Sequence, residues 1–167
     1  PKFKAHIIIN TPDMDADEFH EHFLLSPKET DFPELFRYTF PDAIITNRFI
    51  NNEGENYDKQ LRWDFMIGMR FDTGEIPRFS DERAGGPRYA QIIGEMNSLR
   101  MQYAEFMMDG QFTIRDTSPL PYDVYRTEYE AEDGRLLRIL YNASDEAKEA
   151  NGILLQPDEM RFDIFPA

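Results

Sequence analysis

Residues 86–110 read GPRYAQIIGEMNSLRMQYAEFMMDG, and this stretch decides the fold that the sequence predicts. Its apolar residues recur three or four positions apart, which is the signature of a helix with one buried face. They are Tyr89, Ile92, Ile93, Met96, Leu99, Tyr103, Phe106 and Met107. Pro87 suits the first position of a helix, and Gly110 can take the left-handed conformation that ends one. We therefore expect a single long helix from Gly86 to Gly110.

The chain before this helix mixes strands with a second helix. Residues 3–10 (FKAHIIIN) and 43–46 (AIIT) read as strands, because short apolar runs bounded by turn residues are typical of buried strands. A helix is predicted over about residues 57–70, where Leu61 and Phe65 share one face and Trp63 widens the apolar stripe. This half of the chain therefore has an α/β character.

The chain after the long helix reads as short strands. They are predicted at residues 111–115, 123–130, 135–141, 153–155 and 160–165. A turn at residues 132–134 joins two of these strands into a hairpin, and residues 142–152 form a polar connection. Alternating strands of this kind imply a small antiparallel sheet or half-sandwich. The predicted domains are an α/β segment, residues 1–113, and a small antiparallel β-domain, residues 114–167. A single α+β domain is the alternative.

The amino-acid composition limits the classes of function that this chain can have. The chain of 167 residues is 41% hydrophobic and carries a formal net charge of −14, so it is globular and strongly acidic. Such a charge disfavours nucleic acid and anionic membranes as partners. No cysteine is present, which excludes disulfides and thiolate metal sites and leaves the compartment open. No metal or cofactor is expected, because the Asp13-Asp15-Asp17 pattern lacks the glycine and glutamate of a calcium loop.

Three segments carry a resemblance to a known family. They are PELFRYTFPDAIIT (residues 33–46), FMIGMRFD (residues 65–72) and YAEFMMDGQF (residues 103–112). Together they resemble the last part of a (β/α)8 glycoside-hydrolase-like barrel, in uncharacterised glycosidase-like families that carry such an LFRY-x-FPD segment late in the barrel. In those enzymes an antiparallel β-sandwich follows the barrel. The resemblance implies a TIM-barrel remnant followed by a C-terminal β-domain.

A complete barrel needs about 250 residues, which is more than precede the β-rich part of this chain. The resemblance therefore implies that only the last barrel strands and helices are present. The missing barrel portion is expected on another chain or to have been removed; otherwise the segment folds as its own α/β domain. Parallel pairing of residues 43–46 with the segment before the long helix would preserve the barrel origin, and a wholly antiparallel sheet would exclude it.

Glycoside hydrolysis uses two carboxylates placed about 5–10 Å apart, often with aromatic side chains that stack on the sugar. The resemblance makes Asp42, Glu53 and Glu55 the candidate catalytic residues. The candidate substrate-binding residues are Arg37, Tyr38 and Trp63. Each has a structural alternative. The glutamates can be solvated loop charges, Asp42 a turn residue, Arg37 the partner of a buried carboxylate and Trp63 a core residue.

Two further motifs allow more than one interpretation. Gly85-Gly86-Pro87, flanked by Arg83 and Arg88, is either an anion site at a helix N-terminus or simply the start of a helix. Asn142-Ala143-Ser144 is a glycosylation sequon, which has meaning only for a protein secreted from a eukaryote.

The resemblance implies a carbohydrate-active, glycoside-hydrolase-like protein fragment that is catalytic only when the rest of the barrel is supplied. The alternative is a non-catalytic ligand-binding or protein-interaction domain. The expected partners are a carbohydrate and, for the helix face from Tyr89 to Met107, either the missing barrel portion or a second copy of the chain.

Overall fold

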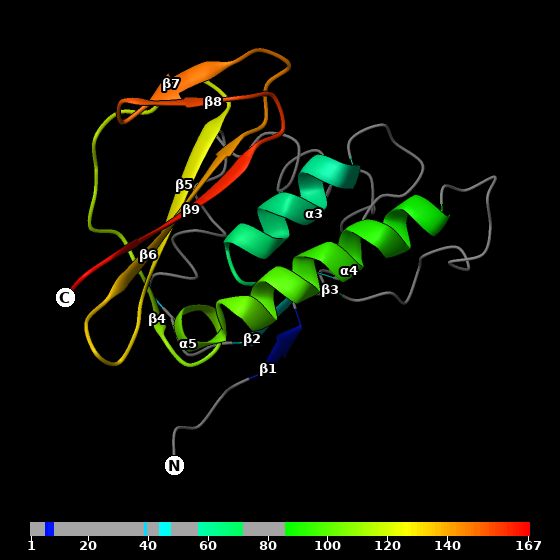
Figure 1. Cartoon of the computed structure of the whole chain (residues 1–167). Coiled ribbons are helices and arrows are strands. Elements are labelled where there is room, and N and C mark those ends of the chain that lie inside the picture. Colours follow the sequence, from blue (N-terminus) through cyan, green and yellow to red (C-terminus); the bar gives the residue numbers. More distant parts are fainter. Residues whose placement is uncertain (1–5, 9–38, 40–43, 48–56, 72–85) are drawn as a thin grey trace. The chain divides into compact units, whose positions relative to one another are not determined.

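The computed structural model describes residues 6–8, 39, 44–47, 57–71 and 86–167 (Figure 1). The chain divides into two compact units, residues 1–102 and residues 103–167. The second unit begins ahead of the predicted domain boundary, because the residues just after 102 pack with the antiparallel sheet.

The first unit contains a parallel sheet. Strand β1 (His6–Ile8) pairs with β2 (Ile44–Asn47), and β2 pairs with β3 (Arg70–Phe71), in the order β1-β2-β3. Both predicted strands of this half are confirmed. Helix α3 lies between β2 and β3 in the chain, so these elements form a β-α-β unit.

Helix α3 spans Tyr57–Met66, and it is shorter than the sequence predicted. Gly68 has a φ of 75°, which is the left-handed conformation that ends a helix. The Gly68 N–H donates to the Phe65 carbonyl at 3.0 Å, and the Met69 N–H donates to the Asp64 carbonyl at 2.8 Å. This pattern is a Schellman motif, and it turns the chain directly into β3. The predicted apolar stripe is confirmed, since the side chains of Leu61, Trp63, Phe65, Met66 and Ile67 are buried.

The predicted single helix over residues 86–110 is wrong in its length. Helix α4 spans Gly86–Gln102, Tyr103 leaves helical geometry with φ −107° and ψ 28°, and α5 covers only Ala104–Met107. The Tyr103 ring stacks on Phe162 in the second unit, with centroids 4.8 Å apart, a contact that periodicity cannot reveal. The predicted apolar face is confirmed, because its members are buried or partly buried within the chain itself.

Gly110 is needed for a reason other than the one predicted. The glycines with positive φ in the described residues are Gly68, Gly134 and Gly152, so Gly110 is not left-handed. A Cβ at this position would instead collide with the backbone carbonyl oxygens of Phe106 and Glu130. The glycine therefore permits a close approach between the end of α5 and the sheet.

The second unit is built on an antiparallel sheet in the order β4-β5-β6-β9. The strands are β4 (Gln111–Thr113), β5 (Val124–Glu130), β6 (Leu136–Asn142) and β9 (Met160–Phe165). The predicted β5–β6 hairpin is confirmed, and Gly134 in its turn has a φ of 84°. The chain thus combines a parallel α/β segment with an antiparallel β unit.

A second, separate hairpin was only half predicted. Strand β7 (Lys148–Ala150) lies in the stretch predicted to be a polar connection, and it pairs with β8 (Ile153–Leu155). The predicted strands β8 and β9 follow one another in the chain, but they do not pair with each other, because β9 pairs with β6. The β7 sequence KEA is too short and too polar to show a strand pattern.

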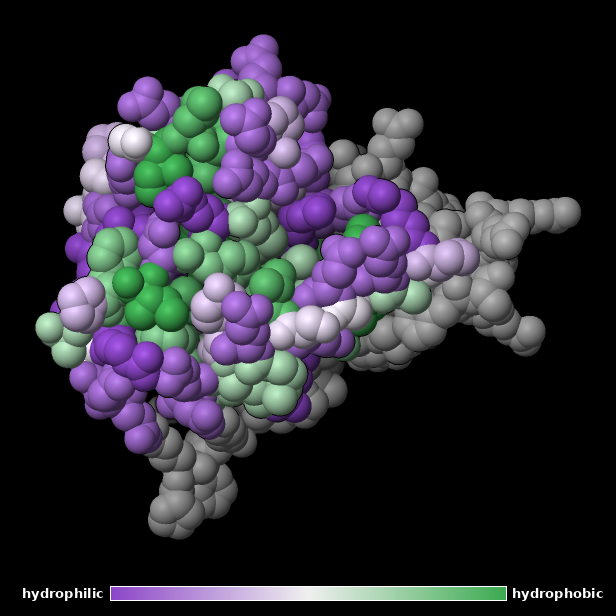
Figure 2. Space-filling view, viewed as in Figure 1, coloured by the Kyte–Doolittle hydropathy of each residue, from purple (hydrophilic) through white to green (hydrophobic). Residues whose placement is uncertain are grey.

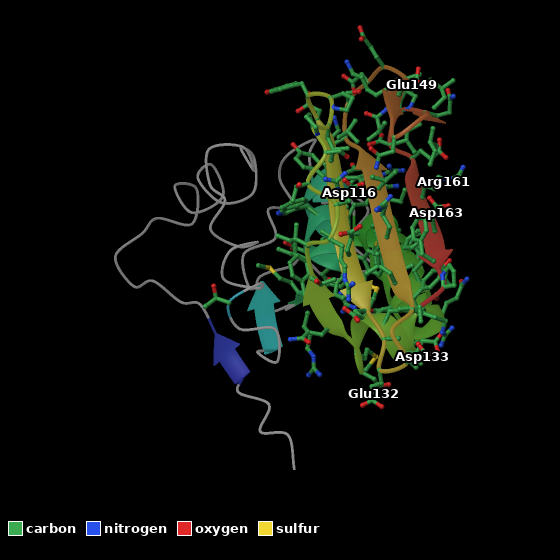
Figure 3. All side chains as sticks on the ribbon, turned by 90° about the vertical axis from the view of Figure 1, so that its left-hand side faces the viewer. Asp116, Glu132, Asp133, Glu149, Arg161 and Asp163 are labelled. Atoms are coloured by element: carbon green, nitrogen blue, oxygen red, sulfur yellow. The ribbon has the colours of Figure 1, made fainter. Side chains whose placement is uncertain are left out.

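The two faces of the antiparallel sheet differ in polarity. One face buries Phe112, Tyr129, Leu137, Ile139 and Tyr141. The opposite face carries the charged residues of β5, β6 and β9, and Figure 3 shows Asp116 near β5 with Arg161 and Asp163 along β9. The β7–β8 hairpin covers one end of this polar face. The hairpin and the sheet pack together there through a small hydrophobic core of Val124, Leu140, Ala150 and Leu155. On the face seen in Figure 2, hydrophilic groups are interspersed with several apolar patches.

Candidate functional site

The residues predicted to act on a carbohydrate lie almost entirely outside the described part of the chain. These are Arg37, Tyr38, Asp42, Glu53 and Glu55. Trp63 is described; it lies in α3 with 4% of its surface exposed, which agrees with the core interpretation. Its substrate-binding role stays a prediction. In chain order, Glu53 and Glu55 fall between β2 and α3, whereas Asp42 precedes β2.

Two described helices of the first unit, α3 and α4, each carry a buried polar side chain. Asp64 of α3 and Tyr89 of α4 are 0% and 1% exposed. Burial first, and then the nearby negative charge of Asp64, raise the pKa of the Tyr89 hydroxyl well above its ordinary value. This phenol therefore stays protonated throughout the working range of an enzyme. Such a phenol is unsuited to general acid–base catalysis near neutral pH.

The arginines of α4 are engaged in contacts within the first unit. Arg88 forms an ion pair with Asp58 of α3, which favours the plain helix start over the predicted anion site. Arg100 donates to the Met69 carbonyl at 2.5 Å, and its guanidinium lies 5.0 Å from the centre of the Phe71 ring. Arg100 thus holds the turn between α3 and β3 in place.

The strongest polar constellation in the described residues lies on the charged face of the antiparallel sheet. Glu128 of β5 is 2% exposed, and one of its oxygens receives the Arg138 guanidinium at 2.9 Å. Its other oxygen accepts the backbone N–H groups of Arg115 at 2.6 Å and Asp116 at 3.0 Å. These charge-assisted hydrogen bonds compensate for the desolvation of the buried carboxylate. They also leave no lone pair directed at a substrate.

Asp116 extends this constellation toward the β7–β8 hairpin. Its carboxylate pairs with Arg126 at 3.0 Å and with Arg138 at 3.2 Å. The pKa of Asp116 is lowered, first by hydrogen bonds from the Ser118 side chain and backbone and then by the charges of the two arginines. The Asn151 side-chain amide donates to Asp116 at 3.2 Å, and the Ser118 hydroxyl donates to the Asn151 amide oxygen at 3.2 Å.

We call this constellation the clamp. Its members are Asp116, Ser118, Arg126, Glu128, Arg138 and Asn151. It joins the segment after β4 to two sheet strands and to the hairpin turn. The lowered pKa of Asp116 makes its carboxyl group a poor proton donor near neutral pH. The contacts of the clamp tie these segments of the second unit together.

The clamp was not predicted, although part of its signal is visible in the sequence. Arg126 and Glu128 are two residues apart in a predicted strand, and such a spacing places both side chains on one face. Their partners Asp116 and Arg138 could not be assigned, because they come from other segments and no periodicity links them.

Asn142, the sequon asparagine, is a buried structural residue. It is 0% exposed, and its side-chain nitrogen donates to the carbonyls of Glu146 at 2.7 Å, Gln156 at 3.0 Å and Leu155 at 3.2 Å. Its amide oxygen accepts the Ser144 hydroxyl at 2.7 Å. In the folded protein this nitrogen is thus enclosed and cannot be reached for attachment of a glycan.

Comparison with models of known protein families gives no match to this sequence, and comparison with curated proteins gives none either. Among the helices that the structure describes, none is long and apolar enough to cross a membrane. Over the same residues, no group of three or more potential His, Asp or Glu ligands is placed to hold a metal ion.

Proposed function

We propose that this chain is the C-terminal portion of a carbohydrate-active, glycoside-hydrolase-like (β/α)8 barrel. Any catalysis would require the remaining barrel strands. The observation that carries the proposal is the parallel order β1-β2-β3 in the first unit. In a (β/α)8 barrel, successive strands are neighbours, run parallel and are joined by helices. The pairing of β2 with β3 through α3 agrees with that arrangement.

The second unit supports the same proposal. The glycosidase families that the sequence resembles place an antiparallel β-domain after the last barrel helix. Here the antiparallel sheet follows α4 and α5 directly in the chain. The carboxylates of its clamp are bonded to neighbouring groups, which is compatible with a structural role for this unit in the proposed enzyme.

The strand topology ranks the candidate catalytic residues. Active sites of parallel α/β barrels form from the segments that follow the carboxyl ends of the strands. Glu53 and Glu55 follow β2, so they belong to such a segment, whereas Asp42 precedes the strand. We therefore favour the two glutamates as the catalytic carboxylates. Arg37, Tyr38 and Trp63 remain the proposed substrate contacts.

The test measures hydrolysis of a panel of chromogenic aryl glycosides. It uses this chain and the longer product of the genomic frame where the frame extends upstream of Pro1. Activity confined to the longer product is the expected result. A frame that starts within a few residues of Pro1 would contradict the truncated-barrel part of the proposal. Oligosaccharide binding without turnover in either form would favour the non-catalytic binding domain.

In an active form, Glu53→Gln or Glu55→Gln should lower kcat/KM by about 10²–10⁴-fold, as expected for loss of a general acid or base. Glu149→Gln is the matched control, since this exposed glutamate of β7 lies in the β unit. Wild-type rates in both test variants would remove these residues from the mechanism. An equal loss in the control would show a general effect of charge removal.

A further inference from the structure

The turn of the β7–β8 hairpin consists of Asn151 and Gly152. The register pairs Ala150 with Ile153 and leaves only these two residues in the loop. Their φ angles are 53° and 75°, both in the left-handed region that a type I′ turn requires. Both residues are exposed, and nothing lies within 4 Å of the position that a Gly152 Cβ would take.

The Asn151-Gly152 peptide is accessible for reaction in a way that the peptides after Asn97 and Asn142 are not. Among the described residues, the Gly152 N–H makes no hydrogen bond. By contrast, Asn142 is enclosed, and the N–H of the following Ala143 donates to the Asp123 carbonyl at 2.8 Å. Asn97 is exposed but lies inside α4, where backbone N–H groups are held in the helical ladder.

We infer that Asn151 is a site of spontaneous deamidation and that its conversion to a carboxylate loosens the clamp. In the first step, the Gly152 backbone nitrogen loses its proton and attacks the Asn151 side-chain carbonyl carbon. The new C–N bond closes a succinimide, and the side-chain nitrogen leaves as ammonia. Water then opens the ring at either carbonyl. The product is aspartate or isoaspartate, with one water consumed and one ammonia released.

The position of Asn151 in the clamp gives this change a structural consequence. Its amide nitrogen donates to the Asp116 carboxylate at 3.2 Å. Deamidation replaces that donor with a second carboxylate, so an attraction becomes a repulsion between like charges. The isoaspartate product also adds a methylene to the backbone of a two-residue turn, which cannot then keep the type I′ geometry. Both effects release the hairpin from the segment that contains Asp116 and Ser118.

The site is tested by incubating the folded chain in mildly alkaline buffer and mapping its peptides by mass spectrometry. The Asn151 peptide should show the mass gain of an amide replaced by a carboxylate, while the Asn97 and Asn142 peptides stay intact. An Asn151 peptide that persists as long as the Asn97 peptide would overturn the assignment.

The loosening of the clamp by the new charge is tested with Asn151→Asp, which introduces that charge without altering the backbone. This variant should lower the melting temperature by about 2–4 °C. In the Asp116→Asn background, where the repelling charge is gone, the same substitution should lower it less. A wild-type melting temperature for Asn151→Asp, or an equal loss in both backgrounds, would contradict repulsion from Asp116.

Discussion

Two glycines show how differently the same residue type can act at the residue scale. Gly110 lies where a Cβ would collide with two backbone carbonyl oxygens, those of Phe106 and Glu130. Gly94 lies on an exposed position of α4, and a Cβ there would meet nothing within 4 Å. Backbone carbonyls cannot swing aside as a flexible side chain does, so only one of the two positions requires glycine.

Substituting each glycine with alanine should therefore change stability in opposite directions. Gly110→Ala should lower the free energy of unfolding by about 1–3 kcal/mol, because it overpacks the contact between α5 and the sheet. Gly94→Ala should raise it by about 0.5–1 kcal/mol, since alanine is the better helix former. Urea denaturation measures both values. A neutral Gly110→Ala variant would show that the close approach relaxes at little cost.

The buried side-chain amide of Asn142 supplies the hydrogen-bond donor for several backbone carbonyls. Its nitrogen donates to the carbonyls of Glu146 before β7, of Leu155 at the end of β8 and of Gln156 after it. An aspartate has the same shape but no N–H to donate, so all three carbonyls would face a carboxylate.

Asn142→Asp should consequently destabilise the protein by at least about 1–3 kcal/mol, the cost of buried polar groups without partners. Asn97→Asp provides the control, since it makes the same chemical change at an exposed helical position. Thermal unfolding followed by circular dichroism compares the two. Equal melting temperatures in both variants would mean that the Asn142 bonds contribute little.

At the scale of elements, the clamp determines how the segment after β4 lies on the sheet. Hydrogen bonds from Arg115 and Asp116 to Glu128 place the backbone, and the arginines of β5 and β6 neutralise the carboxylates. The β7–β8 hairpin then joins through Asn151. Polar contacts on this face of the sheet thus hold both the segment after β4 and the hairpin turn.

The lowered pKa of Asp116 makes this element sensitive to acid. Because the folded pKa lies below the unfolded one, the contribution of Asp116 is fully present above the ordinary aspartate pKa of about 4. It is lost as the pH falls below that value toward the lowered folded pKa. Asp116→Asn should flatten this acid limb of the stability profile. The midpoint of urea unfolding, measured at several acidic pH values, gives this profile. Glu132→Gln in the exposed β5–β6 turn is the control. Parallel profiles for wild type and Asp116→Asn would refute the role of Asp116 in the acid sensitivity.

The charge of the whole molecule is dominated by acids that have no basic counterpart. The formal net charge is −14. In the second unit every lysine and arginine already forms an ion pair with an acidic neighbour, so no basic group remains to balance the surplus. Such a surplus keeps the protein soluble but makes its compact state repel itself.

Salt should therefore stabilise this protein. Raising the ionic strength from about 0.01 M to 0.15 M shortens the Debye length from about 30 Å to 8 Å and screens the repulsion. We expect the melting temperature to rise over this range, and to rise equally with sodium chloride and potassium chloride. A falling melting temperature would mean that the screened ion pairs outweigh the self-repulsion.

Local pattern predicted the elements of this protein well. The strands at β1, β2, β5, β6 and β9 and the buried stripes of α3 and α4 follow from spacings of two or of three and four, which depend only on neighbouring residues. The helix boundaries were less accurate. The turn at Gly68 and the break at Tyr103 depend on where the chain must go next. The candidate carbohydrate residues rest on resemblance, and Trp63 alone among them lies in the described chain.

The sequence by itself determined most of the elements, their order and the acidic character of the chain, because these are properties of composition and period; strands β3 and β7 were not among them. Only the tertiary structure decided that β1, β2 and β3 run parallel, that β7 pairs with β8, and that Asp116 meets Arg138. It also decided why Gly110 must be a glycine and why Asn142 is buried. Each of these depends on contacts between residues far apart in the chain, and no local spacing encodes such contacts.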